Sequence, residues 1–340
     1  MEQCDRCGQR AISYNSCLNR HCPKCQAAAQ QTWLAERSTE LLPVPYYHVV
    51  FTLPHLLAPL ALQNKALVYS LLFRAVAQTL LQIAADPKRL AAKIGFMAVL
   101  HTWGQTMLHH PHIHCVVPAG GLSPDHRRWI PCGPKFFLPV HVLRVVFRGK
   151  FLQALQLAFK QHKLTLAGQL VPLQSPANFA ALLRAAAQPN WVVYVKRPFA
   201  GPAQVLTYLS RYTHRIAITN SRLVSIANGS VTFRWRDYAH GHQTRTMTLE
   251  ANEFLRRFLL HVLPASFVRI RYFGLLANRH RGQLLALCRS HLKTVPPPPS
   301  TADDARLCPY CRSGRMRVIE ILSPIQVSTW LHAPQPENSS

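Results

Sequence analysis

An apolar run that opens on two alternating histidines constrains the fold of this 340-residue chain more than any other feature. The run reads "HIHCVVPAGGL" and extends from His112 to Leu122. β-Branched residues followed by a glycine pair predict a strand, and neighbouring residues of a strand point to opposite faces of its sheet. We therefore expect His112 and His114 to project together from one face, while Ile113 enters the core on the other.

Two neutral imidazoles that lie side by side are suited to bind a divalent metal ion. A single histidine is more often an ordinary polar contact, but the pair at the start of an apolar strand favours a metal site. His109 and His110 stand before Pro111 and are expected in a loop.

The rest of the chain mixes helix and strand patterns without regular βαβ alternation. This mixture predicts an α+β fold, with helices on one side of a sheet. We expect strands over 46–53, 95–103, 112–122 and 191–199, helices over 26–42, 57–86, 142–164 and 201–218, and a β-ribbon followed by a helix over 231–264.

The charge of the chain indicates its partner. Lysine and arginine total 39 against 13 acids, which gives a formal net charge of +26. Such a charge on a folded chain implies a polyanion, most often a nucleic acid. Between Glu40 and Asp237 the only acids are Asp86 and Asp125. A two-metal or carboxylate-triad nuclease needs more carboxylates than this region supplies, so metal chemistry here should depend on histidine.

Targeting and membrane signals are lacking in the sequence. No run of about 18 uncharged apolar residues is found, so we expect no membrane span. The first residues, "MEQCDRCGQR", fit neither a signal peptide nor a transit sequence. The cysteines should therefore be reduced thiols rather than disulfides.

Five of the ten cysteines fall within the first 25 residues. Two CxxC turns that face each other build a tetrahedral zinc site, so this segment predicts structural zinc. The predicted ligands are Cys4, Cys7, Cys22 and Cys25, with Cys17 and His21 as substitutes. A further pair near the C-terminus, Cys308-Pro-Tyr-Cys311, is either a free pair or the remnant of a second zinc ribbon.

Two tyrosines lie one helical turn apart in the segment predicted as a helix over 201–218. Tyr208 and Tyr212 would share a face, which often means only core packing. Cationic neighbours such as Arg211 and Arg215 lower the pKa of a phenol from about 10, and a divalent ion polarises a phosphate. Attack by the phenolate would leave a covalent phosphotyrosine and a free DNA hydroxyl.

These motifs together resemble a known family. A His-hydrophobic-His strand with a tyrosine-bearing helix resembles the HUH endonucleases. The match to the rolling-circle insertion-sequence transposases of the IS91 type is closer and runs from Cys4 to about Arg281. It is carried by "YNSCLNRHCPKCQ", "YYHVVFTLP", "HTWGQTMLHHPHIHCVVPAGGLSP" and "YLSRYTHRIAITNSRL". Family members usually carry further residues before the first CxxC, whereas three precede it here, so we expect a shortened zinc module.

The resemblance implies an HUH-endonuclease-like, antiparallel-rich central sheet with helices, preceded by a small zinc-binding module. It also implies a set of functional residues and a division of the chain. Tyr208 and Tyr212 would be the catalytic tyrosines, and His112 and His114 would hold Mg²⁺ or Mn²⁺. The third ligand is left open among His48, His101, Gln105, Gln204 and His214. Phosphate contacts are expected from Lys196, Arg197, Arg211, Arg215, Arg234 and Arg236, with Trp235 and Tyr238 stacking on bases.

The expected parts of the chain are a zinc module and connecting helix (1–40), an HUH catalytic domain (41–225), a ribbon and helices that continue it (226–294), and a proline-rich linker and tail (295–340). The implied partners are single-stranded insertion-sequence ends and target DNA, in the bacterial cytoplasm at the nucleoid. Two alternatives stay open: a rolling-circle replication initiator or relaxase, which shares the chemistry, and a non-catalytic zinc protein that binds nucleic acid.

Overall fold

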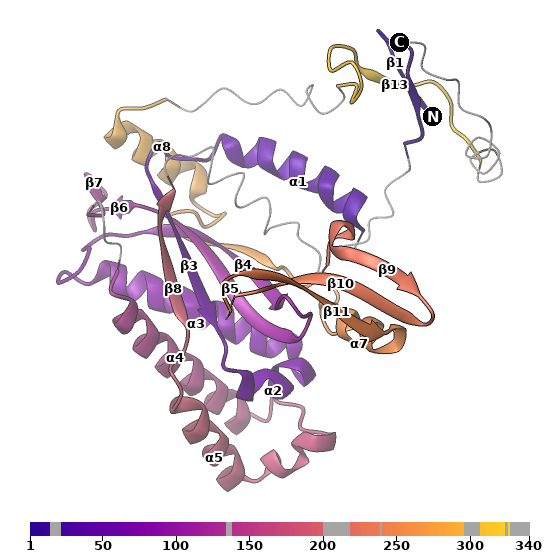
Figure 1. The fold of residues 1–340 in the computed structure, drawn as a ribbon. Coiled ribbons are helices and arrows are strands. Elements are labelled where there is room, and N and C mark those ends of the chain that lie inside the picture. The colour runs from indigo at the N-terminus through magenta and orange to yellow at the C-terminus, as the bar shows by residue number, and fades with distance from the viewer. Residues whose placement is uncertain are drawn as a thin grey trace.

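A five-stranded antiparallel sheet organises the chain (Figure 1). The computed structural model describes residues 1–13, 22–133, 138–199, 218–238, 240–295, 307–323 and 326. The strands of the sheet lie in the order β12 (Ile270–Gly274), β4 (Gly95–Trp103), β5 (His109–Pro118), β3 (Tyr46–Thr52) and β8 (Val193–Phe199), and each neighbouring pair is antiparallel. The α+β fold with an antiparallel sheet is thus confirmed.

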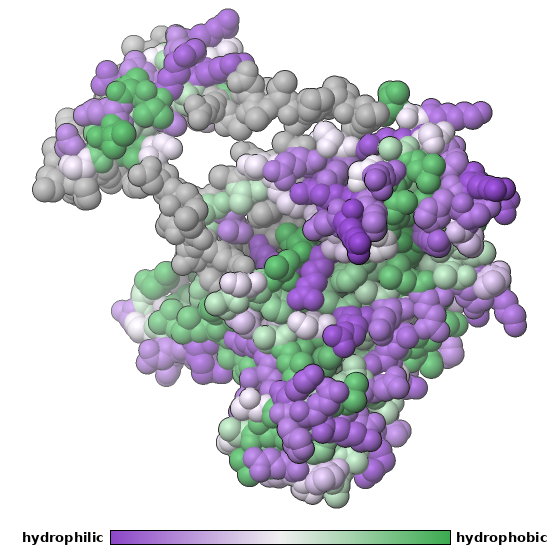
Figure 2. All heavy atoms as spheres, turned by 180° about the vertical axis from the view of Figure 1, so that it is seen from behind, coloured by the Kyte–Doolittle hydropathy of each residue, from purple (hydrophilic) through white to green (hydrophobic). Residues whose placement is uncertain are grey.

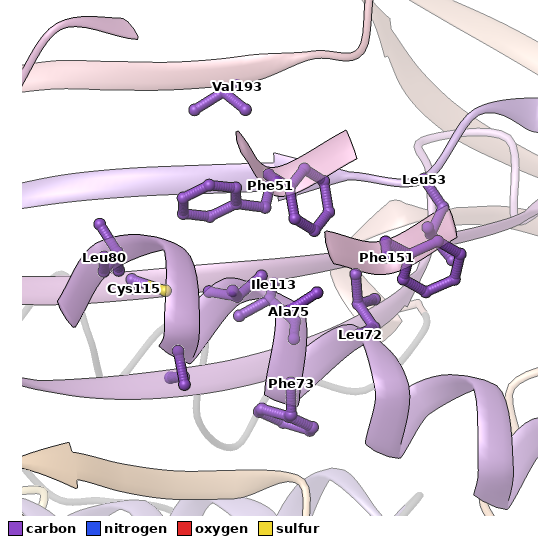
Figure 3. Packing of buried hydrophobic residues seen from close by; sticks show 14 of the residues in the cluster. Phe51, Leu53, Leu72, Phe73, Ala75, Leu80, Ile113, Cys115, Phe151 and Val193 are labelled. Carbon is purple, nitrogen blue, oxygen red and sulfur yellow. The ribbon is translucent and has the colours of Figure 1, made fainter. Parts of the chain in front are cut away.

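One face of this sheet carries the main core. Every second residue of the strands points to it, and among them Phe51, Ile113 and Cys115 are fully buried. Helices α3 (Lys65–Ala85) and α4 (Val140–Lys160) cover this face. Figure 3 shows the strand side chains together with Leu72 and Phe151 from the helices. The alternation in the sequence therefore fixes which face each strand residue occupies.

Helix α3 is long and apolar enough, by length and composition alone, to cross a membrane. Most of its apolar window is buried inside the fold, where Tyr69, Leu72 and Val76 contact the main core. This is the pattern of a core helix.

Among the described residues, the opposite face of the sheet is covered by helices at one end. Tyr46, Met97 and Val116 pack there against α8 (Arg281–Leu292), and Trp33 of α1 (Pro23–Ser38) joins them. Helices were expected on one side of the sheet, but the structure has them on both, because α8 follows the edge strand β12 and buries this second apolar patch. The remaining part of the face carries histidines.

A second sheet packs beside the first. It has the order β11 (Gln243–Glu250), β10 (Ser230–Asp237) and β9 (Leu223–Ala227), and α7 (Ala251–Leu259) follows it. Phe233 and Ile218 form a small core with Met107, which lies in the turn between β4 and β5. The ribbon predicted over 231–264 is present and is anchored at this turn.

The two described ends of the chain meet in a small third sheet (Figure 1). Its order is β13 (Met316–Val318), β1 (Glu2–Cys4) and β2 (Arg10–Ala11). The register pairs Cys4 with Met316 across antiparallel strands. The C-terminal segment, expected as a linker and tail, therefore contributes a strand to the N-terminal module.

The remaining elements are short or peripheral. They are η1 (His55–Leu57), α2 (Ala58–Gln63), the β6–β7 pair (Gly120–Leu122 with Trp129–Pro131), η2 (Gly168–Gln174), α5 (Pro176–Ala187) and η3 (Asn220–Arg222). Figure 2 shows hydrophilic and hydrophobic residues interspersed over the face that it presents.

Candidate functional site

Three histidines converge on the face of the central sheet opposite the main core. His112 and His114 lie on β5, and His101 of β4 is the direct strand partner of His112. One nitrogen of each ring lies within 4.8 Å of one nitrogen of the others. His101 and His114 are 2% and 8% exposed, whereas His112 is half-buried and gives access from solvent. We call these three residues the histidine triad.

The triad follows from strand alternation, as the sequence predicted. His112 and His114 share a face, while Ile113 is buried in the main core on the other. Among the described residues, the group of metal-capable side chains at this position contains three histidines and no carboxylate. The scarcity of acids in this part of the sequence thus agrees with a candidate metal site made of imidazole nitrogens.

The His112 ring is oriented by its own strand. Its Nδ1 lies 2.7 Å from the carbonyl oxygen of His110. Because a carbonyl can only accept, Nδ1 of the neutral ring carries the proton and Nε2 carries the lone pair. Such a backbone contact is the usual way in which a metal-binding histidine is held in one tautomer.

A fourth histidine supports the triad from the next strand. His48 of β3 places its Nε2 2.8 Å from Nδ1 of His114, and the two rings stack with centroids 5.0 Å apart. Burial, with a smaller effect of the nearby Lys196, lowers the pKa of His48 to about 4. The ring is therefore neutral near pH 7, so the pair shares a single hydrogen bond without like-charge repulsion.

His109 and His110 lie on β5 and not in a loop, so the loop prediction was wrong. Pro111 is compatible with the strand. Its carbonyl oxygen accepts a hydrogen bond from the backbone N–H of Leu53, and its own nitrogen carries no hydrogen that would need a partner. His109 points to the main core, where Tyr69 lies 2.7 Å from its Nε2. Burial, followed by the charges of His261 and Lys65, lowers the pKa of His109 to about 4.

This buried histidine predicts a loss of stability in acid. In the unfolded chain His109 takes up a proton near its ordinary pKa of 6.5, but in the folded chain only near 4. Its contribution is complete above about pH 6.5 and is lost as the pH falls towards 4, by about 3 kcal/mol for a shift of this size.

The His109→Gln variant keeps an acceptor for Tyr69 and removes the titrating ring. Urea unfolding at pH 7 and pH 4 should show a smaller loss for the variant than for the parent. Parallel pH profiles of the free energy of unfolding would contradict this account.

The other candidates for a third ligand lie elsewhere or outside the described residues. Gln105 lies in the turn after β4, where its Oε1 accepts from the backbone N–H of Arg236. Gln204 and His214 fall outside the residues that the structure describes, as do Tyr208 and Tyr212. Of the candidates that the structure describes, His101 is the one that joins His112 and His114.

The turn between β4 and β5 is held by residues of α7 and of the segments that flank the second sheet. Arg222 donates to the carbonyl oxygen of Gln105 at 2.5 Å, Arg257 to that of Thr106 at 3.2 Å, and His261 to that of Met107 at 2.9 Å. This turn joins the two strands that carry the triad. The second sheet is therefore anchored at the turn that links the two triad strands.

The predicted phosphate contacts occupy two places. Lys196 is the strand partner of His48, so it lies on the histidine face. Arg234 and Arg236 are exposed on one face of β10. Trp235, expected to stack on bases, points to the other face of β10 and packs against the small core. The side chain of Arg197, and Arg211 and Arg215 entirely, fall outside the described residues.

The four cysteines that the structure brings together differ from the predicted set. Cys4 and Cys7 lie with Cys308 and Cys311, and their four sulfurs are within 4.8 Å of one another. Cys22 and Cys25 belong instead to the start of α1, while Cys17 and His21 fall outside the described residues. Proximity in sequence favoured the local pair, but the β1–β13 pairing brings the distant pair to Cys4. We call the four residues the terminal cysteine cluster.

Comparison with known proteins gives one consistent result. Residues 95–283 match the family model described as "Putative transposase", and residues 1–53 match the "Transposase zinc-binding domain". The histidine triad lies within the first segment, and Cys4 and Cys7 lie within the second. A zinc-binding domain together with a four-cysteine cluster supports a structural zinc ion in this chain.

Two relatives are similar over most of the chain. A protein of Sinorhizobium fredii described as "Putative transposase y4qJ" is 53% identical, over 96% of this chain and 85% of the relative. The transposase for insertion sequence element IS801 of Pseudomonas savastanoi pv. phaseolicola is 31% identical, over 84% of this chain and 67% of the relative. No solved structure matches the chain.

Proposed function

This chain belongs to the IS91-like family of transposases, and on that premise we propose that it nicks single-stranded DNA at insertion-sequence ends through a tyrosine and transfers the strand by a rolling-circle mechanism. The observation that carries the proposal is the histidine triad, because it brings three metal-capable imidazoles together within the transposase segment, where carboxylates are scarce.

The donor set fits a divalent transition metal. Three imidazoles supply nitrogen ligands, which suit Mn²⁺ better than Mg²⁺, since Mg²⁺ prefers carboxylate, carbonyl and water oxygens. His101, His112 and His114 would hold the ion, and His48 would orient His114. A bound ion would polarise the scissile phosphate. Of the two metals expected from the sequence, the triad therefore favours Mn²⁺.

In the proposed reaction, a tyrosine oxygen displaces the 3′ oxygen of the DNA at the scissile phosphorus. A tyrosine phenolate, from Tyr208 or Tyr212, attacks the scissile phosphate and forms a new oxygen–phosphorus bond. The bond to the 3′ oxygen breaks, and that oxygen takes a proton to become a free 3′ hydroxyl. The 5′ phosphate stays on the tyrosine, so the energy of the broken bond is kept for a second transfer.

Cations around the triad suit the DNA strand that this reaction needs. Lys196 lies beside His48 on the triad's face, and Arg234 and Arg236 are exposed on the sheet that is anchored next to it. Contacts of this kind bind phosphates through charge, with an affinity that falls as salt rises. We infer that a single strand crosses the triad between these two sets of cations.

Formation of a covalent protein–DNA adduct tests the proposal. End-labelled single-stranded DNA from an insertion-sequence end, incubated with the protein and Mn²⁺, should become attached to the chain and survive denaturation. The labelled 3′ fragment should carry its phosphate on the protein, while the 5′ fragment ends in a free hydroxyl. Cleavage that releases both fragments unattached would contradict a tyrosine nucleophile, because water would then be the attacking group.

The third ligand has its own test. The His101→Ala variant should bind Mn²⁺ at least about tenfold more weakly than the parent, since it removes one of three imidazole donors. Gln105→Ala is the matched control, because its side chain contacts the backbone of Arg236 and lies outside the triad. Paramagnetic resonance of free Mn²⁺ measures binding directly. If Gln105→Ala weakens Mn²⁺ binding as much as His101→Ala, the assignment of His101 fails.

A further inference from the structure

We propose that the terminal cysteine cluster binds one zinc ion through all four thiolates, so that a single metal site joins the two ends of the chain. Cys308 and Cys311 lie far outside the segment that matches the transposase zinc-binding domain, which ends at residue 53. The proposal does not depend on the tyrosine chemistry, because none of the triad or tyrosine residues takes part in it.

The sulfur positions fit a tetrahedral zinc ion. Sγ of Cys4 lies 3.7 Å from Sγ of Cys311, and Sγ of Cys7 lies 3.7 Å from Sγ of Cys308. Zinc–sulfur bonds of about 2.3 Å in a tetrahedron put the sulfurs about 3.8 Å apart. A disulfide would bring two sulfurs to about 2.05 Å, and all four cysteines are free thiols. The spacing therefore matches a metal site and not a pair of disulfides.

The two CxxC turns have the same backbone form. The N–H of Gly8 donates to the carbonyl of Cys4 at 3.2 Å, and the N–H of Arg312 donates to the carbonyl of Cys308 at 3.0 Å. In each turn the residue after the second cysteine is left-handed, with φ of +70° at Gly8 and +53° at Arg312. Two equivalent turns that face each other are the arrangement that presents four thiolates to zinc.

Backbone N–H groups are aimed at the sulfurs. Those of Arg6 and Cys7 lie 3.4 and 3.5 Å from Sγ of Cys4, and that of Gly314 lies 3.3 Å from Sγ of Cys311. Such contacts stabilise the thiolate, which is the form that binds the metal. The N-terminal turn positions the sulfur of Cys4 with its own N–H groups, and the C-terminal turn does the same for Cys311.

The module that contains the cluster has too little apolar core to fold by itself. Its buried apolar residues, among those described, are Cys4, Cys308 and Met316. Two of the three are proposed ligands. In a segment this small a structural metal replaces the missing core, and metal binding then contributes directly to folding. The polar contacts of Asp5 with Arg315 and Arg317 hold the same two chain ends together at the surface.

Thiol alkylation of the full-length protein, read by mass spectrometry, tests the proposal. Cys7 is exposed, so the fold itself does not shield it, and its protection from alkylation would have to come from bound zinc. With zinc bound, Cys4, Cys7, Cys308 and Cys311 should all resist alkylation, and on chelation they should become reactive together. Cys288, which is buried in the second apolar patch, reports whether the fold is intact.

Two double variants separate this ligand set from one formed by the N-terminal cysteines alone. In Cys308→Ser, Cys311→Ser we expect about one zinc fewer per chain, with Cys4 and Cys7 freely alkylated and Cys288 still protected. In Cys22→Ser, Cys25→Ser we expect Cys4 and Cys7 to stay protected. Unchanged zinc in the first variant, or loss of protection at Cys4 and Cys7 in the second, would overturn the proposal.

A glycine substitution tests the geometry without removing a ligand. A Cβ atom at Gly314 would lie 2.4 Å from Sγ of Cys4, whereas a Cβ at Gly282 would meet nothing within 4 Å. The Gly314→Ala variant should lose zinc to a chelator at least about tenfold faster than the parent, and Gly282→Ala should match the parent. Equal zinc retention in Gly314→Ala and the parent would show that Cys4 does not face the C-terminal turn.

Discussion

Replacing His112 or His114 with alanine is expected to lower divalent-dependent nicking by about a thousandfold or more, while binding of single-stranded DNA stays within about twofold of the parent. A three-imidazole site that loses a ligand no longer holds the ion that stabilises charge on the phosphate. That stabilisation is worth several kcal/mol, and each 1.36 kcal/mol of barrier corresponds to about a tenfold change in rate. DNA binding depends on many lysine and arginine contacts and on counterion release, to which these neutral rings contribute little.

Single-turnover nicking with Mn²⁺ and a filter-binding assay with the same DNA measure the two effects separately. His141→Ala is the matched control, because His141 is an exposed histidine at the start of α4 and lies on a different element from the triad. Nicking at the parental rate by either triad variant would show that the triad is not the metal site. A parallel loss of DNA binding would show that the histidines act on binding instead.

The second large effect concerns the two tyrosines. The double variant Tyr208→Phe, Tyr212→Phe should form no covalent adduct, since phenylalanine keeps the ring and lacks the attacking oxygen. Each single variant should fail in complete transposition, and at least one should still form an adduct in a one-step nicking assay. One phenol can hold one DNA end, and rolling-circle transfer needs a second cleavage while that end is still held.

Adduct formation and transposition of a marked element are the two measurements. A double variant that still becomes attached to DNA would place the nucleophile elsewhere. If both single variants transpose at the parental frequency, the need for two tyrosines fails even if one of them is the nucleophile. The Tyr46→Phe variant is no suitable control, because Tyr46 is buried and accepts a hydrogen bond from the backbone of Leu42. Tyr310→Phe, at an exposed position outside the transposase segment, is suitable.

The sequence predicted those parts of the fold that local alternation determines. Strand β4 was predicted over 95–103 and is found there, and the placement of Ile113 opposite His112 and His114 followed from the two-residue period. His101 was one candidate among five, because its position beside His112 depends on the register between β4 and β5. Register is set by turn geometry and by packing on both faces, which a single strand does not reveal.

The zinc ligands, by contrast, could not be predicted from local sequence patterns. Cys22 and Cys25 are near Cys4 and Cys7 in sequence, whereas Cys308 and Cys311 are about 300 residues away, so a local reading favoured the first pair. The structure joins distant segments because β1 pairs with β13. The signal that pointed to this was the second CxxC turn itself, which had no ligand partners nearby in the sequence. Long-range strand pairing between chain ends leaves no local pattern from which it could be deduced.

Mapping the residue that carries the DNA tests the central claim most directly. The adduct formed with single-stranded end DNA and Mn²⁺ would be digested with nuclease and then protease, and its peptides sequenced by mass spectrometry. We expect a nucleotide linked through its 5′ phosphate to the phenolic oxygen of Tyr208 or Tyr212. A nucleotide attached to any other residue, or through a 3′ phosphate, would contradict the account.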